Sequence, residues 1–289
     1  MISSSVFKNL CLFSLFTGAM AWNGPTYPGY KLVWGDSFTS SGVCLPDLAK
    51  WNTIDRETNY NYELESYTSS NNNVRFSGSG TLQLLPRRDD SVPQGWTSGR
   101  IESKYTVSPA ADKITRVESR LRLAGQPGPT RKGLWPAFWL HGDSYRHGTP
   151  TPECGEIDVM ENVNGQKTIY SVIHCDVDPG GRCNESDGIG NNTTLNDDEY
   201  HVWRLEFDRT DSNFKQQSIT WWKDGAEYAK VTGSKIVDPK VWATICEAPL
   251  YIIFNVAVGG SWPGNPNRNT LEGIETMMEI DYVAHFETC

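Results

Sequence analysis

Three acidic residues stand close together in one apolar stretch of the sequence. Glu156, Asp158 and Glu161 lie within residues 155–162, with apolar residues between them. Side chains alternate faces along a strand, so Glu156 and Asp158 share a face and Glu161 points to the other. One extra residue, a β-bulge, would bring Glu161 round to join them. A carboxylate and a protonated carboxylic acid flanking a sugar bond are the usual machinery of glycoside hydrolysis, and the alternative is an ordinary strand with its acidic face in water.

Several tryptophans near these acids are candidates for stacking on sugar rings. Trp135 and Trp139 are four residues apart and would share one face of a strand, where either core packing or sugar binding explains them. Trp262 follows an apolar segment and a pair of glycines. Asn255, within that apolar segment, must find a hydrogen-bond partner if it is buried, either a sugar hydroxyl or a backbone group.

Two basic residues are further candidates. Arg100 either donates to ring hydroxyls or pairs with Glu102, and the ion pair is the plainer interpretation. His174 comes about 13 residues after Glu161, on what we expect to be the next strand. It would then face the carboxylates across the sheet, although a lone histidine is more often structural.

The elements that must position these residues are mostly strands. Alternating or continuous apolar patterns predict them, an Asp-Gly pair predicts a hairpin turn at residues 223–226, and residues 46–51 have room for one helical turn. Many short strands with Gly, Pro and Asn turns favour a β-sandwich in a single domain over residues 22–289. The clearest predicted strands are residues 117–123, 201–208, 219–222, 227–231, 250–258 and 278–286.

The first 21 residues have the pattern of a secretory signal peptide. Lys8 precedes an apolar run that ends at the small-x-small site Ala19–Ala21, and the run is too short for a confident membrane span. We therefore expect a secreted, extracellular or cell-wall protein without a membrane anchor. The net charge of −9 disfavours nucleic acid as a partner.

Cysteine and asparagine patterns agree with secretion. Six cysteines follow the signal segment, which suggests up to three disulfides, and Cys175 and Cys183 flank a loop that they could close. The cysteines and histidines lack the spacing of a zinc site. Asn184, Asn191 and Asn192 begin N-glycosylation sequons.

Taken together, these motifs resemble glycoside hydrolase family 16, in particular its fungal laminarinase-like endo-β-1,3(4)-glucanases. The resemblance spans roughly residues 30 to 286 and combines the acidic motif with His174 and the segments at residues 97–100, 135–139, 255–264 and 278–283. It implies an all-β jelly-roll, two antiparallel sheets with a concave substrate cleft. It also implies a secreted, retaining endo-β-glucanase acting on β-1,3-glucan and on mixed β-1,3/1,4-glucan.

The resemblance assigns roles by position. Glu156 is expected to be the nucleophile, Glu161 the general acid/base and Asp158 the helper between them, whose charge would raise the proton affinity of its neighbours. The expected substrate-binding residues are Arg100, Trp135, Trp139, His174, Asn255 and Trp262.

One position departs from the family pattern. Many members carry Trp-Pro five and four residues before the nucleophile, where this chain has Thr151-Pro152. We expect a monomer without a cofactor. Some family members bind calcium on the outer sheet, but nothing in the sequence identifies such a site. A transglycosylase and a non-catalytic glucan-binding protein on the same fold are the alternatives.

Overall fold

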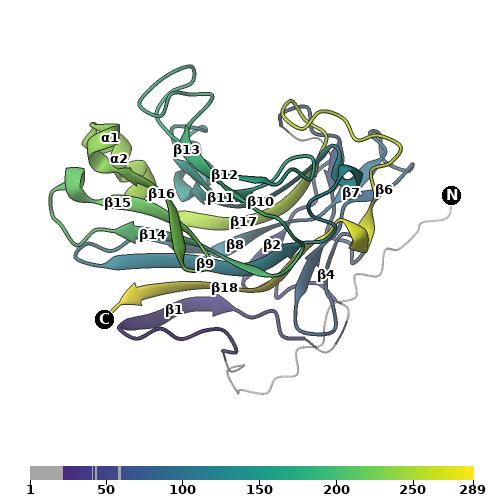
Figure 1. Cartoon of the computed structure of the whole chain (residues 1–289), viewed down its shortest axis with the longest axis horizontal. Coiled ribbons are helices and arrows are strands. Elements are labelled where there is room, and N and C mark those ends of the chain that lie inside the picture. The colour runs from purple at the N-terminus through teal and green to yellow at the C-terminus, as the bar shows by residue number, and fades with distance from the viewer. Residues whose placement is uncertain (1–21, 41, 43, 58–59) are drawn as a thin grey trace.

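The computed structural model describes residues 22–40, 42, 44–57 and 60–289. The expected signal segment, residues 1–21, lies outside the described residues. Most of the described elements are strands, and they stack in two layers (Figure 1). Among the described residues, no helix has the length and apolar character needed to cross a bilayer.

One layer is a seven-stranded antiparallel sheet formed by the described residues, in the order β13-β12-β11-β10-β17-β8-β2. It contains all three acids of the motif, on β11. Its strands are β2 (Trp51–Thr53), β8 (Arg100–Val107), β10 (Leu134–Gly142), β11 (Glu156–Glu161), β12 (Thr168–His174), β13 (Ile189–Thr194) and β17 (Leu250–Val258).

The other layer is an eight-stranded antiparallel sheet in the same described part of the chain, in the order β16-β15-β14-β9-β18-β5-β4 with β1 also paired to β18. Its strands are β1 (Tyr30–Asp36), β4 (Val74–Phe76), β5 (Leu82–Leu84), β9 (Ile114–Leu123), β14 (His201–Asp208), β15 (Ser218–Lys223), β16 (Ala226–Thr232) and β18 (Met278–Thr288). A small sheet of β3 (Glu65–Tyr67), β7 (Trp96–Ser98) and β6 (Arg87–Arg88) contains a parallel pair, β3 with β7.

The predicted strands and hairpin are confirmed. The strands expected at residues 201–208 and 250–258 are β14 and β17 with the same bounds. Asp224 and Gly225 have φ of 50° and 82° between β15 and β16, the left-handed pair of a two-residue hairpin turn. At residues 46–51, backbone hydrogen bonds from Lys50 and Trp51 to Asp47 make one turn but no helix.

Short helices lie outside the sheets. The sequence pattern had not predicted α2, although Asp238 caps it by accepting from the amides of Lys240 and Val241 and a proline follows at its first position. The helical elements are α1 (Gly233–Ile236), α2 (Pro239–Cys246), η1 (Pro129–Arg131), η2 (Asp143–His147), η3 (Phe214–Gln216) and η4 (Gly273–Glu275).

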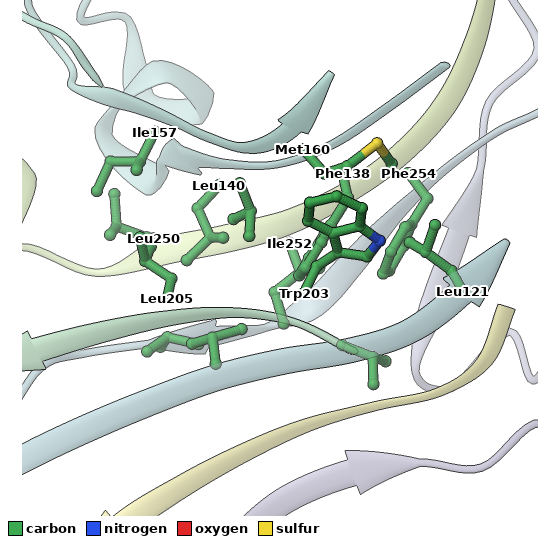
Figure 2. Packing of buried hydrophobic residues seen from close by; sticks show 14 of the residues in the cluster. Leu121, Phe138, Leu140, Ile157, Met160, Trp203, Leu205, Leu250, Ile252 and Phe254 are labelled. Carbon is green, nitrogen blue, oxygen red and sulfur yellow. The ribbon is translucent and has the colours of Figure 1, made fainter. Parts of the chain in front are cut away.

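The core lies between the two sheets, because each contributes its apolar face. Phe138 on β10 and Phe254 on β17 stack at 4.7 Å, Trp203 on β14 packs near them from the opposite layer, and Leu205 on β14 lies near Leu250 on β17 (Figure 2). Alternate residues of the seven-stranded sheet therefore face inward, and the residues between them form its outer face. This pattern places the site on the outer face.

The outer face of the larger sheet is sealed by the segment before β1. Glu118, fully buried, accepts from the hydroxyls of Tyr27 and Tyr282 at 2.8 and 2.9 Å and pairs with Arg204 at 2.8 Å. Trp22 packs edge-on against Tyr282 at 5.7 Å. A buried charge held by so many partners fixes this segment on the sheet.

Candidate active site

A β-bulge interrupts β11 at the position that the acidic motif requires. Against β10, Asp158 pairs with Trp139 and Met160 with Phe138, so Val159 is the extra residue. The pairing with β12 shifts in the same stretch. The inserted residue reverses the alternation of faces beyond it, as the sequence predicted.

The bulge brings the three acids onto one face. Opposed residues of antiparallel strands share a face, and Glu156 and Glu161 oppose His174 and Tyr170 of β12, which are four residues apart. A carboxylate oxygen of Glu156, one of Asp158 and a ring nitrogen of His174 all lie within 4.8 Å of one another. No other group of acids, histidines and cysteines in the described residues is packed closely enough to surround a metal ion.

The carbonyl groups freed by the bulge find partners elsewhere in the sandwich. The Trp221 indole, fully buried on β15 of the opposite sheet, donates to the Asp158 carbonyl at 2.8 Å. Hydroxyls of Ser171 and Tyr228 donate to the Val159 carbonyl at 2.9 and 3.3 Å. Buried carbonyls without partners would be costly, so these side chains stabilise the bulged conformation.

The surroundings give the three acids different proton affinities. Burial, opposed by a 2.7 Å hydrogen bond from the Trp135 indole and by His174, raises the pKa of Glu161 to about 7. Burial and then the charges of Glu161 and Glu156 raise the pKa of Asp158 well above its usual range. The like charge acting on Glu161 is that of Glu156, whereas the sequence led us to expect Asp158 in that role.

The nucleophile candidate has cations nearby. Burial raises the pKa of Glu156, the charges of His174 and Arg100 lower it, and the weaker effect of the Glu185 charge raises it. For His174, burial opposes protonation, but a hydrogen bond to Glu185 and the charges of Glu156, Glu185 and Glu161 outweigh it and raise the pKa to about 8. His174 therefore carries a positive charge beside the acids at neutral pH.

This arrangement matches known proteins. A family model described as "XgeA-like, catalytic GH16 domain" matches residues 125–213. The crystal structure of an endo-1,3-beta-glucanase from Streptomyces sioyaensis has a TM-score of 0.84 and 35% identity to this chain, and the match covers 91% of this chain and 99% of that one. The chain belongs to glycoside hydrolase family 16.

Curated relatives of this family 16 chain include two glucanases. A "Beta-glucanase" from Rhodothermus marinus is 28% identical, and the match covers 89% of this chain and 85% of the relative. A "Glucan endo-1,3-beta-glucosidase A1" from Niallia circulans is 32% identical over 90% of this chain, but this chain covers only 38% of that longer protein. The family is one of glycosidases, and its members share the jelly-roll observed here.

The tryptophans predicted for this family 16 site lie around Glu161. Trp135 and Trp139 are partly exposed on the outer face of β10, and Trp262, 43% exposed, packs edge-on against Trp135 at 5.3 Å. The Tyr170 ring lies 4.9 Å from Trp262, opposite Glu161. The Trp pair is therefore not core packing, because its rings stand on the face that carries the acids.

Arg100 and Asn255 brace this aromatic surface. Arg100 pairs with Glu102 at 2.7 Å, and its guanidinium lies 5.0 Å from the Trp139 ring centroid. Asn255 is buried, accepts from the Trp139 indole at 2.8 Å and donates to the Tyr67 hydroxyl at 3.1 Å. Its partners within the protein are side chains rather than a backbone group, and a sugar hydroxyl as a further partner stays a prediction.

Thr151 stands where many family members carry a tryptophan, and its side chain makes a polar contact. The Thr151 hydroxyl lies 2.8 Å from Nε2 of His141, a residue that the sequence did not single out. His141 Nε2 is also 3.5 Å from Glu156. Burial, with Arg100 and Arg146, lowers the pKa of His141 to about 3, so it stands beside the nucleophile candidate as a neutral ring.

Sequence reasoning also missed two groups of buried acids. Glu185 binds His174 from the loop between β12 and β13. Glu63 and Glu65 form a second carboxyl pair beside the tryptophan surface. Glu65 accepts from the Val258 amide at 2.6 Å. Burial, and then the charge of Glu63, raise the pKa of Glu65 well above its usual range. Neither contact has a local motif, since Glu185 lies 11 positions from His174 and Glu65 lies 193 positions from Val258.

The cysteines follow the prediction in part. Cys175 and Cys183 form the expected disulfide across their loop. Cys154, Cys246 and Cys289 are free thiols, so the upper limit of three disulfides among the six is not reached. Cys154 lies instead against the His141 ring, with Sγ 3.2 Å from Nε2.

Proposed function

We propose that the chain is an endo-acting β-glucanase that hydrolyses β-1,3-glucan by a retaining double displacement, with mixed β-1,3/1,4-glucan as its second substrate. The observation that carries this proposal is the bulge at Val159, which gives Glu156 and Glu161 one common face while their surroundings differ. The glucanase relatives support the substrate class, and the tryptophans beside the acids suit the flat apolar faces of glucose rings.

In the first step, a carboxylate oxygen of Glu156 attacks the anomeric carbon, and the bond from that carbon to the leaving oxygen breaks. Glu161 gives its proton to the leaving oxygen. In the second step, Glu161 takes a proton from water, whose oxygen attacks the same carbon and releases Glu156. Both carboxyl groups return to their starting states, and the configuration at the anomeric carbon is retained.

The electrostatics support this division of roles. Glu161, with a pKa of about 7, holds a proton in mildly acidic solution, as a general acid must. His174 and Arg100 favour the ionised form of Glu156, as a nucleophile requires. A non-catalytic binding protein would have no need of two working glutamates in these different states.

The decisive test replaces the nucleophile. Glu156→Gln is expected to lose more than about a thousandfold in release of reducing ends from laminarin and from mixed-linkage glucan, because the amide cannot form the glycosyl intermediate. Azide should restore turnover to Glu156→Gly as a glycosyl azide product. Wild-type hydrolysis by Glu156→Gln would refute the assignment. Longer oligosaccharides at high acceptor concentration would show that the chain acts mainly as a transglycosylase.

We further propose that residues 1–21 direct secretion and that N-glycans are attached at Asn184 and, of the overlapping sequons, at Asn192. The Asn191 side chain is engaged with the Asn192 amide at 2.9 Å and the Tyr228 carbonyl at 3.4 Å, whereas Asn192 opposes Tyr170 on the outer face. Thr193→Ala removes only the first overlapping sequon and Thr194→Ala only the second.

Expression in a eukaryotic secretory host tests both points. The secreted protein should begin at Trp22, and only Thr194→Ala should lose the mass of one glycan. A secreted protein that keeps residues 1–21, or loss of that glycan in Thr193→Ala alone, would contradict this proposal.

A further inference from the structure

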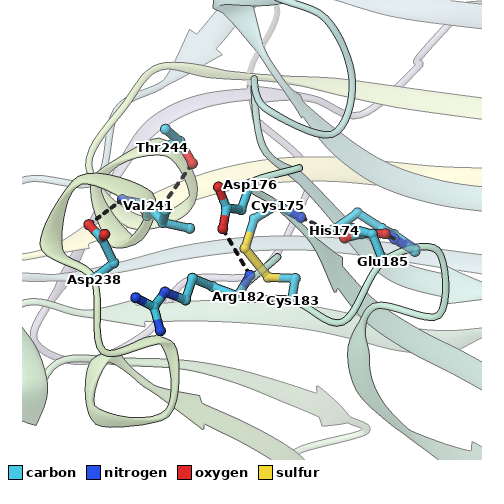
Figure 3. Close-up of a disulfide and its surroundings, with 9 residues drawn as sticks. All are labelled: His174, Cys175, Asp176, Arg182, Cys183, Glu185, Asp238, Val241 and Thr244. Carbon is cyan, nitrogen blue, oxygen red and sulfur yellow. Dashed lines mark hydrogen bonds and ion pairs between the residues drawn. A yellow bond between two sulfur atoms is a disulfide. The ribbon is translucent and has the colours of Figure 1, made fainter. Parts of the chain in front are cut away.

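Glu185 is a buried acid whose two oxygens are both occupied at the edge of the site. Its side chain is 3% exposed, one oxygen accepts from the Cys175 amide at 2.8 Å, and the other lies 2.7 Å from Nδ1 of His174 (Figure 3). A buried carboxylate is retained only when its charge is compensated in this way. The compensating partner here is a residue that touches the catalytic row.

The loop that carries Glu185 is closed covalently. The disulfide joins Cys175, which follows β12 directly, to Cys183, two residues before Glu185. Backbone hydrogen bonds link Glu185 and Gly180 in both directions, and the Arg182 amide donates to Asp176 at 2.9 Å. These links leave the carboxylate little freedom to move away from the His174 ring.

The contact with Glu185 determines which way His174 faces. Because Nδ1 is held by Glu185, the other nitrogen, Nε2, is directed to the acids and lies 3.7 Å from Asp158. All the charged groups that act on the ring are carboxylates, namely Glu156, Asp158 and Glu161 from β11 and Glu185 from the loop, while Arg100 on β8 adds a positive charge near Glu156.

We propose that Glu185 is a positioning residue of this active site: it holds His174 protonated, with Nε2–H turned to the catalytic row, so that the imidazolium keeps Glu156 ionised as the nucleophile. This role rests on the proposed function of Glu156. It explains why a buried acid remains at a site that already has three acids. The negative charge of Glu185 on the Nδ1 side of His174 stabilises the imidazolium that faces Glu156 with its other nitrogen.

The first test is Glu185→Gln, which keeps the shape of the side chain and removes its charge. Two-dimensional NMR of the histidine rings should show the His174 pKa, about 8 in the wild type, falling by about one pH unit or more. On laminarin, kcat/KM should fall about three- to tenfold between about pH 7 and pH 8, where the ring is protonated in the wild type and neutral in the variant, and should stay near the wild-type value at about pH 5, where the ring is protonated in both. KM should change little.

The matched control is Glu199→Gln, which removes an equal charge from an exposed loop position. It should leave both the His174 titration and kcat/KM between about pH 7 and pH 8 at their wild-type values. An unchanged His174 pKa and an unchanged kcat/KM over this pH range in folded Glu185→Gln would overturn the proposal, and so would equal shifts in the control.

A second variant tests the loop rather than the charge. Cys175→Ser combined with Cys183→Ser keeps Glu185 but opens the loop, and we expect both readouts to move in the direction seen for Glu185→Gln, by a smaller amount. Wild-type values for both would show that the disulfide does not position Glu185. The NMR titration needs no turnover, so it judges Glu185 even if the wild type fails to cleave glucan and the proposed function falls.

Discussion

Replacing Trp135 by phenylalanine is expected to move the alkaline limb of activity to higher pH. The Trp135 indole donates to Glu161 at 2.7 Å and thereby favours the ionised carboxylate, against burial, which raises the Glu161 pKa to about 7. Phenylalanine keeps an aromatic face for the sugar but has no donor. The general acid should therefore hold its proton to higher pH in the variant.

The magnitude follows from the contact. A hydrogen bond to a charged group contributes about 1.5–3 kcal/mol net. One pH unit corresponds to about 1.4 kcal/mol, so losing the bond should raise the Glu161 pKa by about one to two pH units. The alkaline limb of kcat/KM, near pH 7 in the wild type, should then lie near pH 8–9.

The assay is kcat/KM on laminarin between pH 4 and pH 10, with Trp139→Phe as the matched control. The Trp139 indole donates to Asn255 rather than to an acid, so its loss should weaken substrate binding without moving the limb. An alkaline limb that stays in place or moves to lower pH in Trp135→Phe would refute the reasoning, as would an equal displacement in Trp139→Phe.

Three other variants test charge, burial and exposure. The folded-state pKa of Glu161 lies above its ordinary 4.5, so this group favours folding at low pH, and the contribution is lost as pH rises through about 7. Glu161→Gln should therefore be more stable than the wild type at pH 8, by at most about 3 kcal/mol in urea unfolding. At pH 4 the variant should show no gain in stability. Glu118→Ala should cost about 3–5 kcal/mol by the same measurement, because Arg204 loses its 2.8 Å buried partner and keeps only Glu206 at 3.8 Å and the Tyr27 hydroxyl; a loss below 1 kcal/mol would contradict the structure. Trp262→Ala, at an exposed position, should raise KM on laminarin about three- to tenfold at unchanged stability; an unchanged KM would exclude it from the substrate surface.

The layers and the acidic row were predictable because both depend on local periodicity. Strands such as β14 and β17 follow from patterns within eight or nine residues, and the bulge follows from a spacing of acids that a regular strand could not place on one face. Glu156, Asp158 and Glu161 therefore lie together as the sequence implied.

The partners of these residues depend on distances that the chain does not encode locally. Asn255 binds Tyr67, 188 positions earlier, and Glu185 becomes relevant only through its contact with His174. Counting cysteines sets only an upper limit on the disulfides, because it cannot tell that Cys154 and Cys246 are buried as free thiols. The short helix α2 was missed for a different reason, since eight residues are too few for a periodic pattern.

The Trp221 indole links the eight-stranded sheet to the active site on the seven-stranded sheet. Because this side chain holds the Asp158 carbonyl across the full thickness of the sandwich, a repacked interior that relaxes the kink would misdirect Glu161 while every residue in reach of the sugar stays the same. Screens for altered activity in this enzyme should therefore include β15, and inactive yet fully folded variants from that strand would identify the kink, rather than the sugar contacts, as the element that was damaged.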